Sequence, residues 1–311
     1  MNVFIRKVKK KLFGSFHFSL NNDVKNTVLV AGVGRSGTTW LSDIINYKND
    51  YRDMFEPFYN ERVEMCRPLK NKLYLRRDEE GALVKLVFEK ILSGKIRDRW
   101  CDSQNKKIIT SRRIIKDIRL NLALGWIKSK FPQIPIIFIM RNPFAVAISK
   151  IKLGWDLDMN EYLSQNALVE DCLSDKLEYL KSLETPFDRF MAQWCIENYI
   201  PLKQLNEEEF KFVFYENICI TPSTELRAIF DYLGKDFTDD VLKTMKRPSS
   251  VSRSDSAIKS EADLVSSWKK HCSDEDYKSG LSVLHKFSMD KIYDDMGIPN
   301  EDFKLDDIRC I

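Results

Sequence analysis

The sequence predicts a single α/β domain whose central, mostly parallel sheet of about five strands is flanked by helices on both faces. Short β-rich runs alternate with longer helical patterns along the chain, which is the order expected of a parallel sheet. The chain has 311 residues, 43% of them apolar, and no repeat or low-complexity linker divides it. A chain of this size and composition can bury one large core.

The strands are predicted from runs of β-branched and aromatic residues. The run 134–140 is continuously apolar, which is typical of a strand buried on both faces. The expected strands are 27–32, 51–55, 113–116, 134–141 and 210–216. Apolar residues at helical spacing predict helices over 38–47, 81–93, 120–130, 143–152, 187–205 and 223–233, with two or three more after residue 260.

The carboxyl ends of these strands select the candidate functional residues. Ligands in parallel sheets bind beyond the ends at which the strands finish. The residues at or just past those ends are therefore expected to lie together. They are residues 32–39, Glu56, Lys116, Arg141 and Tyr215.

The N-terminal segment differs in composition from the rest. The first 20 residues are basic with interspersed aromatic residues and lack the apolar core of a signal peptide. We assign residues 1–25 to a basic arm and 26–311 to the domain. The arm is either solvated or makes weak contact with an anionic membrane surface through residues 1–20. No apolar run approaches the roughly 20 residues of a membrane span.

Charge and cysteine content narrow the class of protein. Fifty basic and 46 acidic residues leave a net charge of +4, which is too small to indicate a nucleic-acid surface. The seven cysteines are scattered and form no Cys-x-x-Cys pair, so neither a metal site nor a redox dithiol is expected. Reduced thiols of this kind favour a cytoplasmic protein. The sequence does not indicate an oligomeric state.

The stretch "GVGRSGTT", residues 32–39, fits the phosphate-loop pattern G-x-x-x-x-G-K-[ST] everywhere except at Thr38, which replaces the lysine. Its position between a strand and a helix predicts a P-loop-NTPase-like fold. The glycines let the backbone approach an anion, and the amides of Ser36, Gly37, Thr38 and Thr39 are expected to point at it. Arg35 supplies a cation in the turn. Because the usual lysine binds the β- and γ-phosphates, its absence disfavours a triphosphate ligand.

Two motifs together resemble one enzyme family. "GRSGTTW" resembles the 5′-phosphosulfate-binding loop of sulfotransferases, which use 3′-phosphoadenosine 5′-phosphosulfate (PAPS). The family's second motif is a strand ending in Arg, followed by Asn/Asp-Pro and by Ser eight residues after the Arg. The stretch "RNPFAVAIS" supplies it with Arg141, Asn142, Pro143 and Ser149. The resemblance extends in outline from about residue 26 to about residue 290.

The resemblance implies a set of PAPS contacts. Arg141 and Ser149 would bind the 3′-phosphate, for which the guanidinium offers a bidentate fork. Trp40 and Tyr215 would contact the adenine, or else they only pack in the core. Ser249 and Arg253 resemble a late loop that folds over the cofactor, or they belong to a flexible surface loop.

Sulfuryl transfer to an alcohol also needs a base. Steroid and phenol sulfotransferases use a histidine, but His17, His271 and His285 lie in the arm or the late helices, so a histidine base is not expected. Glu56 occupies a place comparable to the glutamate of the glycan and tyrosyl sulfotransferases. Pro57 predicts an extended Glu56, and the apolar flank predicts a raised pKa of its carboxyl group. The alternative is a structural ion pair with a residue such as Arg52.

Positive charge must stabilise the leaving phosphate. Lys116 has a counterpart near the sulfuryl group in the same branches, whereas Arg119 either contacts an acidic acceptor or caps the following helix. The implied mechanism is in-line displacement, in which Glu56 takes the acceptor proton while Arg35, Lys116 and loop amides stabilise the departing 5′-phosphate. Adenosine 3′,5′-bisphosphate (PAP) is the product, and no metal is required.

The acceptor is expected to carry a hydroxyl group. The use of glutamate favours a glycan or glycolipid by resemblance alone, and segments 61–107 and 154–186 are expected to shape its pocket. Two other functions remain open. One is a P-loop kinase using ATP and Mg²⁺, with Thr39 on the metal and Glu216 or Asp117 as the strand-end acid. The other is a non-catalytic nucleotide-binding protein of the same fold.

Overall fold

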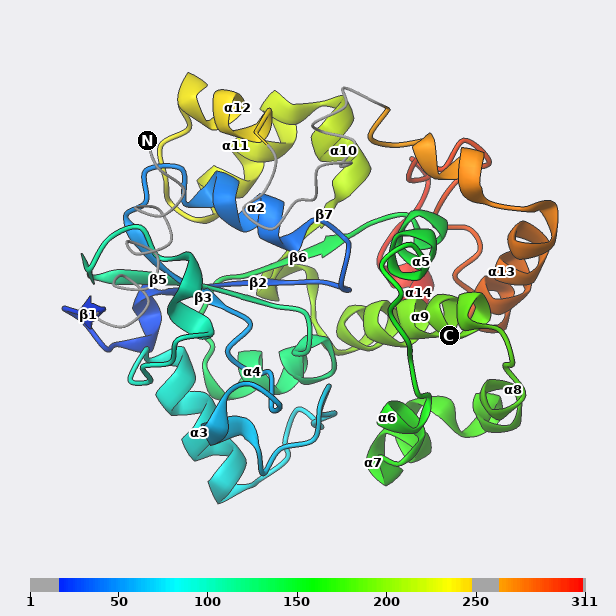
Figure 1. Ribbon diagram of the computed structural model, residues 1–311, viewed down its shortest axis with the longest axis horizontal. Helices are drawn as coiled ribbons and strands as arrows, with labels where there is room; N and C mark the ends of the chain where they lie inside the picture. Colours follow the sequence, from blue (N-terminus) through cyan, green and yellow to red (C-terminus); the bar gives the residue numbers. More distant parts are fainter. Residues whose placement is uncertain (1–16, 248–262, 310–311) are drawn as a thin grey trace.

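Five parallel strands form the central sheet of the computed structural model, which describes residues 17–247 and 263–309 (Figure 1). Their spatial order is β3 (Tyr51–Phe55), β5 (Arg112–Asp117), β2 (Thr27–Ala31), β6 (Ile136–Met140) and β7 (Lys211–Phe214). The predicted α/β class and all five predicted strands are confirmed. The last strand ends earlier than predicted, because Tyr215 begins helix α10 (Tyr215–Ile220).

Side chains of the central strands alternate between two cores, one on each face of the sheet. In β2, Leu29 and Ala31 enter one core, whereas Val28 and Val30 enter the other. The second core is covered by α2 (Thr38–Ile45), α10, α11 (Pro222–Tyr232) and α12 (Asp239–Met245), as Figure 1 shows above the sheet. The first core is covered by α3 (Ala82–Leu92), α4 (Leu124–Lys130) and α9 (Pro186–Gln204).

The predicted helices are present, and their starts follow capping rules. Pro143 begins α5 (Pro143–Ile151), and the Asn142 side chain accepts a hydrogen bond from the amide of Ala145 at 3.2 Å. After residue 260 the helices are α13 (Asp274–Lys286) and α14 (Asp306–Arg309). Five helices were not predicted. Two of them are α10 and α12, and the other three are too short for a periodic pattern: α6 (Asn160–Leu163), α7 (Asn166–Leu168) and α8 (Leu177–Lys181).

Single helical turns of other types connect these elements. The π-helical segment is η5 (Val169–Leu173). The 3-10 turns are η1 (Val24–Asn26), η2 (Glu64–Cys66), η3 (Cys101–Gln104), η4 (Asn121–Ala123), η6 (Ser174–Lys176), η7 (Glu207–Glu209) and η8 (Ser267–His271).

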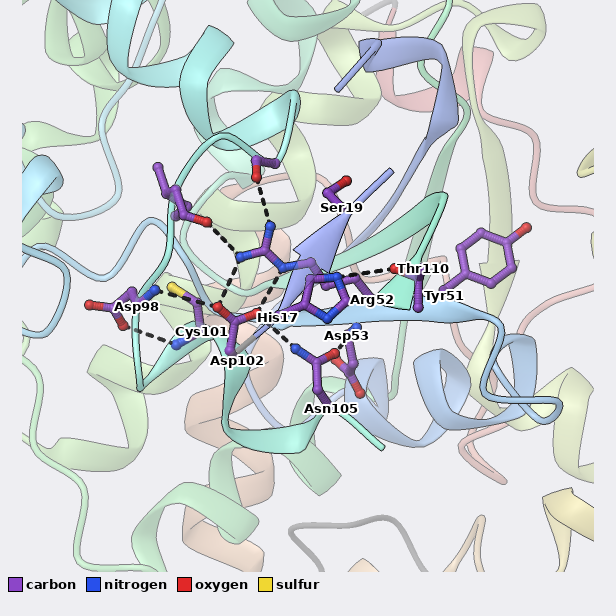
Figure 2. A network of polar contacts seen from close by, with 12 residues as sticks. His17, Ser19, Tyr51, Arg52, Asp53, Asp98, Cys101, Asp102, Asn105 and Thr110 are labelled. Atoms are coloured by element: carbon purple, nitrogen blue, oxygen red, sulfur yellow. Dashed lines mark hydrogen bonds and ion pairs between the residues drawn. The ribbon is translucent and has the colours of Figure 1, made fainter. Parts of the chain in front are cut away.

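A buried ion pair fixes η3 to the central sheet (Figure 2). Arg52 of β3 is 1% exposed and donates to both carboxylate oxygens of Asp102, at 2.8 and 2.9 Å. The remaining guanidinium hydrogen bonds go to the carbonyl oxygens of Gly94 and Ile96, at 2.7 and 2.6 Å. Arg52 is therefore paired with Asp102 and is not the partner of Glu56. The alternative of a structural ion pair at Glu56 stays open with other partners, because Lys116 and Arg119 contact its carboxylate.

The end of the predicted N-terminal arm packs beside this pair. β1 (Phe18–Ser19) forms a small parallel sheet with β4 (Ile109–Thr110). His17 is buried there, and its burial, together with the nearby charge of Arg52, lowers the pKa of the imidazole. The division at residue 25 and a membrane contact through residues 1–20 stay predictions, since residues 1–16 lie outside the described part. Within that part, no helix is long and apolar enough to cross a membrane.

Candidate active site

A cavity of about 1020 Å³ lies where the carboxyl ends of the strands were predicted to bring the site together. Ligand pockets commonly measure about 300–1000 Å³, so this cavity has room for a nucleotide and a second substrate. Ser249 and Arg253 lie outside the described residues. The predicted site residues that line the cavity are Arg35, Gly37, Thr38, Thr39, Trp40, Glu56, Lys116, Arg141, Ser149 and Tyr215.

The phosphate loop presents the start of α2 to the cavity. Gly37 is the N-cap of α2, with φ of +93°, and no side chain caps the helix. The amides of the first helical turn lack intrahelical acceptors, so they suit an anion. Ser36 differs from the prediction: its amide donates to the carbonyl oxygen of Val33 at 3.0 Å, which closes the turn, and its side chain is fully buried.

Three residues far apart in the sequence meet beside this loop. The Nε of Arg35 donates to the Ser149 hydroxyl at 3.0 Å, across 114 residues of sequence. Arg141 donates from Nη1 to the carbonyl oxygen of Arg35 at 3.3 Å. Its Nε is buried without a hydrogen-bond partner. The two arginines and the hydroxyl thus form a cationic corner in which the Nε of Arg141 is a spare donor, which fits a phosphate group.

Trp40 and Tyr215 form the aromatic side of this corner. Their ring centroids are 5.3 Å apart, and the Arg141 guanidinium carbon lies 4.3 Å from the Tyr215 centroid. The indole nitrogen of Trp40 donates to the Met245 carbonyl oxygen at 3.0 Å. Burial raises the pKa of the Tyr215 phenol. Both rings are 4% exposed and pack in the core while still reaching the cavity, so their contact with adenine stays a prediction.

Glu56 is held between two cations at the end of β3. Its Oε1 accepts from the Lys116 Nζ at 2.5 Å, and its Oε2 accepts from Nη1 of Arg119 at 2.7 Å. Burial by itself would raise the pKa of Glu56, but the charges and hydrogen bonds of Lys116 and Arg119 outweigh it, so the pKa is lowered. The predicted rise in this pKa is wrong, because it followed from burial against the apolar flank alone and the two cations have the larger effect.

The backbone of Glu56 also differs from the prediction. Its φ is +45°, a left-handed value, instead of the extended geometry expected before Pro57. Its amide donates to the Lys116 carbonyl oxygen at 2.7 Å and its carbonyl accepts from the Tyr59 amide at 3.3 Å. These two bonds define a tight turn that overrides the preference set by proline.

The two strand-end acids considered for a magnesium site have other partners. Asp117 accepts from the amides of Phe58 and Arg119, at 2.9 and 2.8 Å, and burial raises its pKa to about 6. Glu216 accepts from the Asn142 amide at 2.9 Å. Neither carboxylate lines the cavity. In the described part of the chain, no cluster of three or more His, Cys, Asp or Glu side chains could hold a metal ion.

The sequence placed all three histidines away from the site, and for His271 this is wrong. The turn η8 packs against α5, where the Trp268 ring stacks on Phe144 with centroids 5.1 Å apart. This packing brings His271 to the cavity wall. His17 lies by the Arg52 pair instead, and His285 is exposed on α13.

Sequence reasoning also left unassigned several polar residues that line the cavity. Segments 61–107 and 154–186, expected to shape the acceptor pocket, do contribute to its wall. Asn71, Lys72 and Glu161 lie in a loop or a short helix, which has no periodic pattern. The unassigned polar lining includes Asn71, Lys72, Lys150, Glu161, Gln193 and Glu197. Arg119, for which an acceptor contact or a helix cap was expected, lines the cavity and donates to Glu56.

The glycine at position 37 gives a direct test of the loop. A Cβ there would lie 2.8 Å from the Tyr215 ring, and φ of +93° strains any other residue. We expect Gly37→Ala to lower the free energy of unfolding by about 1–3 kcal/mol and to abolish stabilisation by PAP. Urea unfolding and thermal-shift assays measure the two effects. The control is Gly234→Ala, where φ is +60° and nothing lies within 4 Å. Equal effects of the two changes would contradict a specific need for Gly37.

Several solved structures are similar to the chain. The sulfotransferase domain from the curacin biosynthetic pathway has a TM-score of 0.45 and 13% identity, with 88% of this chain and 98% of that chain covered. Mouse sulfotransferase SULT7A1 complexed with PAP has a TM-score of 0.42 and 18% identity, with 89% and 88% covered. Sulfotransferase STF9 from Mycobacterium avium has a TM-score of 0.43 and 12% identity, with 85% and 76% covered. Similarities this weak carry no information on donor, acceptor or mechanism.

The family can be assigned from the sequence as a whole. No curated protein sequence matches the chain. The model of the sulfotransferase domain family, however, matches residues 25–305, which include both phosphate motifs and nearly the whole domain. A match of this length shows that the chain belongs to the sulfotransferase domain family.

Proposed function

We propose that the protein transfers the sulfuryl group of PAPS to a hydroxyl acceptor, with a carbohydrate or glycolipid as the favoured acceptor. The observation that carries the proposal is the meeting of Arg35, Ser149 and Arg141 beside the amides that begin α2. The amides that begin α2 and the pair of Arg141 and Ser149 can each bind an anion. Two such groups side by side suit a nucleotide with phosphate groups on both the 3′ and the 5′ oxygen of its ribose. The family assignment supports the same reaction class.

Different residues of the loop and the cationic corner would bind the 5′-phosphosulfate and the 3′-phosphate. The amides of Gly37, Thr38 and Thr39 would hold the 5′-phosphosulfate, with Arg35 beside them. Arg141, which has a buried Nε to spare, and Ser149 would hold the 3′-phosphate. Trp40 and Tyr215 would contact the adenine. Arg35 lies between the two groups, since it contacts Ser149 through its side chain and Arg141 through its carbonyl oxygen.

Glu56 and Lys116 would carry the transfer step. Glu56 is ionised in the resting protein, and it would take the proton of the acceptor hydroxyl as that oxygen forms its bond to sulfur. PAPS, when bound, supplies the sulfuryl group. Lys116, Arg35 and the loop amides would stabilise the charge left on the 5′-phosphate oxygen when its bond to sulfur breaks. A bound anion near Lys116 would also weaken its hold on Glu56 and thereby strengthen the base.

Nucleotide preference tests this proposal against a kinase. We expect PAP at about 100 times its Kd to raise the melting temperature by several degrees, since ligand binding at that excess adds about 2.7 kcal/mol. ATP with Mg²⁺ should raise it much less, because the loop lacks its lysine and neither Asp117 nor Glu216 reaches the cavity. Stabilisation by ATP with Mg²⁺ but not by PAP would contradict the proposal. Radiolabelled PAPS with a panel of alcohols then separates an enzyme from a non-catalytic binding protein.

A further inference from the structure

Backbone strain marks three residues of the cavity. Five described non-glycine residues have a positive φ, and Arg35, Glu56 and Lys72 line the cavity, with values of +79°, +45° and +48°. Left-handed backbone is costly outside glycine and concentrates at functional sites. Arg35 and Glu56 have roles in the proposed reaction. Lys72 has the same kind of backbone in the same cavity and has no role so far.

Lys72 is held by side chains of α6 and α9, which contribute one part of the cavity wall. Its Nζ lies 3.1 Å from Oε1 of Glu197 and 3.2 Å from Oε2 of Glu161, and it donates to the Tyr162 hydroxyl at 2.8 Å. Glu197 is 1% exposed, and Gln193 donates to its Oε1 at 3.0 Å. The two carboxylates carry one negative charge more than the single lysine neutralises. This wall is therefore unsuited to a phosphate or another strong anion.

The same wall has an unused hydrogen-bond acceptor. The Nδ2 of Asn71 donates to Oε1 of Glu161 at 3.0 Å, and Oε2 of Glu161 lies 3.2 Å from the Lys72 Nζ. Oδ1 of Asn71 is buried and accepts no hydrogen bond. Both Asn71 and Glu161 line the cavity. Buried polar atoms are normally satisfied, so the Asn71 oxygen calls for a donor supplied by a ligand.

We propose that Asn71, Lys72 and Glu161 form the subsite that binds a hydroxyl-rich part of the acceptor, such as a sugar ring. A hydroxyl group both donates and accepts, so one hydroxyl can donate to Oδ1 of Asn71 while a neighbouring hydroxyl donates to a further lone pair of the Glu161 carboxylate. Lys72, whose Nζ already faces Glu197, Glu161 and the Tyr162 hydroxyl, holds that carboxylate in place. This assignment rests on the proposed sulfuryl transfer, because it places the acceptor in the cavity that contains Glu56.

The chain connection supports this placement. Asn71 and Lys72 lie on the segment between β3 and α3, which begins at Glu56, and Glu161 lies in α6 beside that segment (Figure 1). One connection therefore carries the proposed base at its start and the proposed acceptor contacts near its end. The buried contacts of Lys72 with Glu197 and Tyr162 hold that end in place.

The test uses three named acceptors with radiolabelled PAPS: 4-nitrophenyl β-glucoside, 4-nitrophenyl β-galactoside and 2-naphthol. We expect at least one glycoside to have a higher kcat/KM than 2-naphthol. Asn71→Ala and Glu161→Ala should each raise the KM for that glycoside by about tenfold or more, and leave the KM for PAPS unchanged. Both variants keep the ion pair of Lys72 with Glu197, and urea unfolding of each variant checks that the fold is retained. The matched control is Glu178→Ala, which removes an exposed glutamate from α8.

The results of this test separate failure of the acceptor subsite from failure of the donor assignment. A preference for 2-naphthol, transfer to neither glycoside, or unchanged glycoside KM values in both variants would overturn the subsite, provided that PAP still stabilises the protein. Failure of PAP to stabilise the wild type would instead overturn the donor assignment. A rise in both the glycoside KM and the PAPS KM would show a general distortion of the cavity and would also count against the subsite.

Discussion

Replacing Glu56 by Gln is expected to lower sulfuryl transfer by about two orders of magnitude or more, the usual effect of removing a general base, while PAP binds with near-normal affinity. Glutamine keeps the size and one acceptor oxygen of the side chain, but it cannot take a proton. Radiolabelled transfer from PAPS and a PAP thermal shift measure the two properties separately.

The matching control is a change at His271. Among the described histidines, His271 is the one that lines the same cavity as Glu56. His271→Gln should change transfer by only a few-fold. If instead His271→Gln abolished transfer and Glu56→Gln preserved it, the base assignment would be reversed. Loss of PAP binding in Glu56→Gln would indicate that the glutamate mainly holds Lys116 and Arg119 in position.

The same substitution should change the dependence of stability on pH. Because the pKa of Glu56 is below its ordinary value in the folded protein, the carboxylate adds stability above pH 4.5, and this stability is lost as the pH falls through the lowered pKa. Wild type should therefore be more stable than Glu56→Gln at about pH 6, and the difference should shrink towards about pH 3. Urea unfolding at several pH values measures it. A difference that grew on acidification would contradict the lowered pKa.

Replacing Arg141 by Ala is expected to weaken PAP binding by about 100-fold, the effect of losing two charge-assisted hydrogen bonds. The loss should be specific to the 3′-phosphate. Wild type should bind PAP much more tightly than adenosine 5′-phosphate, and Arg141→Ala should bind the two with similar affinity. Calorimetric titration of both nucleotides measures this ratio.

Two comparisons make the Arg141 result decisive. Arg141→Lys keeps the charge but loses the planar fork, so its PAP affinity should lie between those of wild type and Arg141→Ala. Arg141 also lies over the Tyr215 ring, a contact that would give it a structural role. Equal losses of PAP and adenosine 5′-phosphate binding in Arg141→Ala would favour that structural role over recognition of the 3′-phosphate.

The sequence predicted the sheet and the placement of the phosphate motifs well, for physical reasons. Strands such as β6 are continuous apolar runs, and residues at the carboxyl ends of parallel strands must share one edge of the sheet. From that rule alone we expected Arg35, Glu56, Lys116 and Arg141 to lie together, and all four line the cavity. Their proposed roles await the experiments above.

What the sequence could not predict depends on side-chain partners. The lowered pKa of Glu56 follows from the charges of Lys116 and Arg119, and the Arg119 side chain reaches the glutamate from 63 positions further along the chain. The cavity position of His271 depends on the docking of Trp268 against α5. The Asn71 and Glu161 contact joins a loop to a four-residue helix. Neither segment has periodicity, so no pattern could have placed them.

The left-handed backbone at Arg35, Glu56 and Lys72 limits how the protein can be engineered for heat resistance. Glycine at these positions would relieve the strain, which costs about 1 kcal/mol or more at each. At Glu56 and Lys72 this relief would be outweighed by the loss of buried ion pairs with Lys116, Arg119 and Glu197, and at Arg35 it would remove the cation of the phosphate loop. Stabilised variants should be sought away from these three positions, because relief of backbone strain there would be exchanged for an ion pair or for the proposed function.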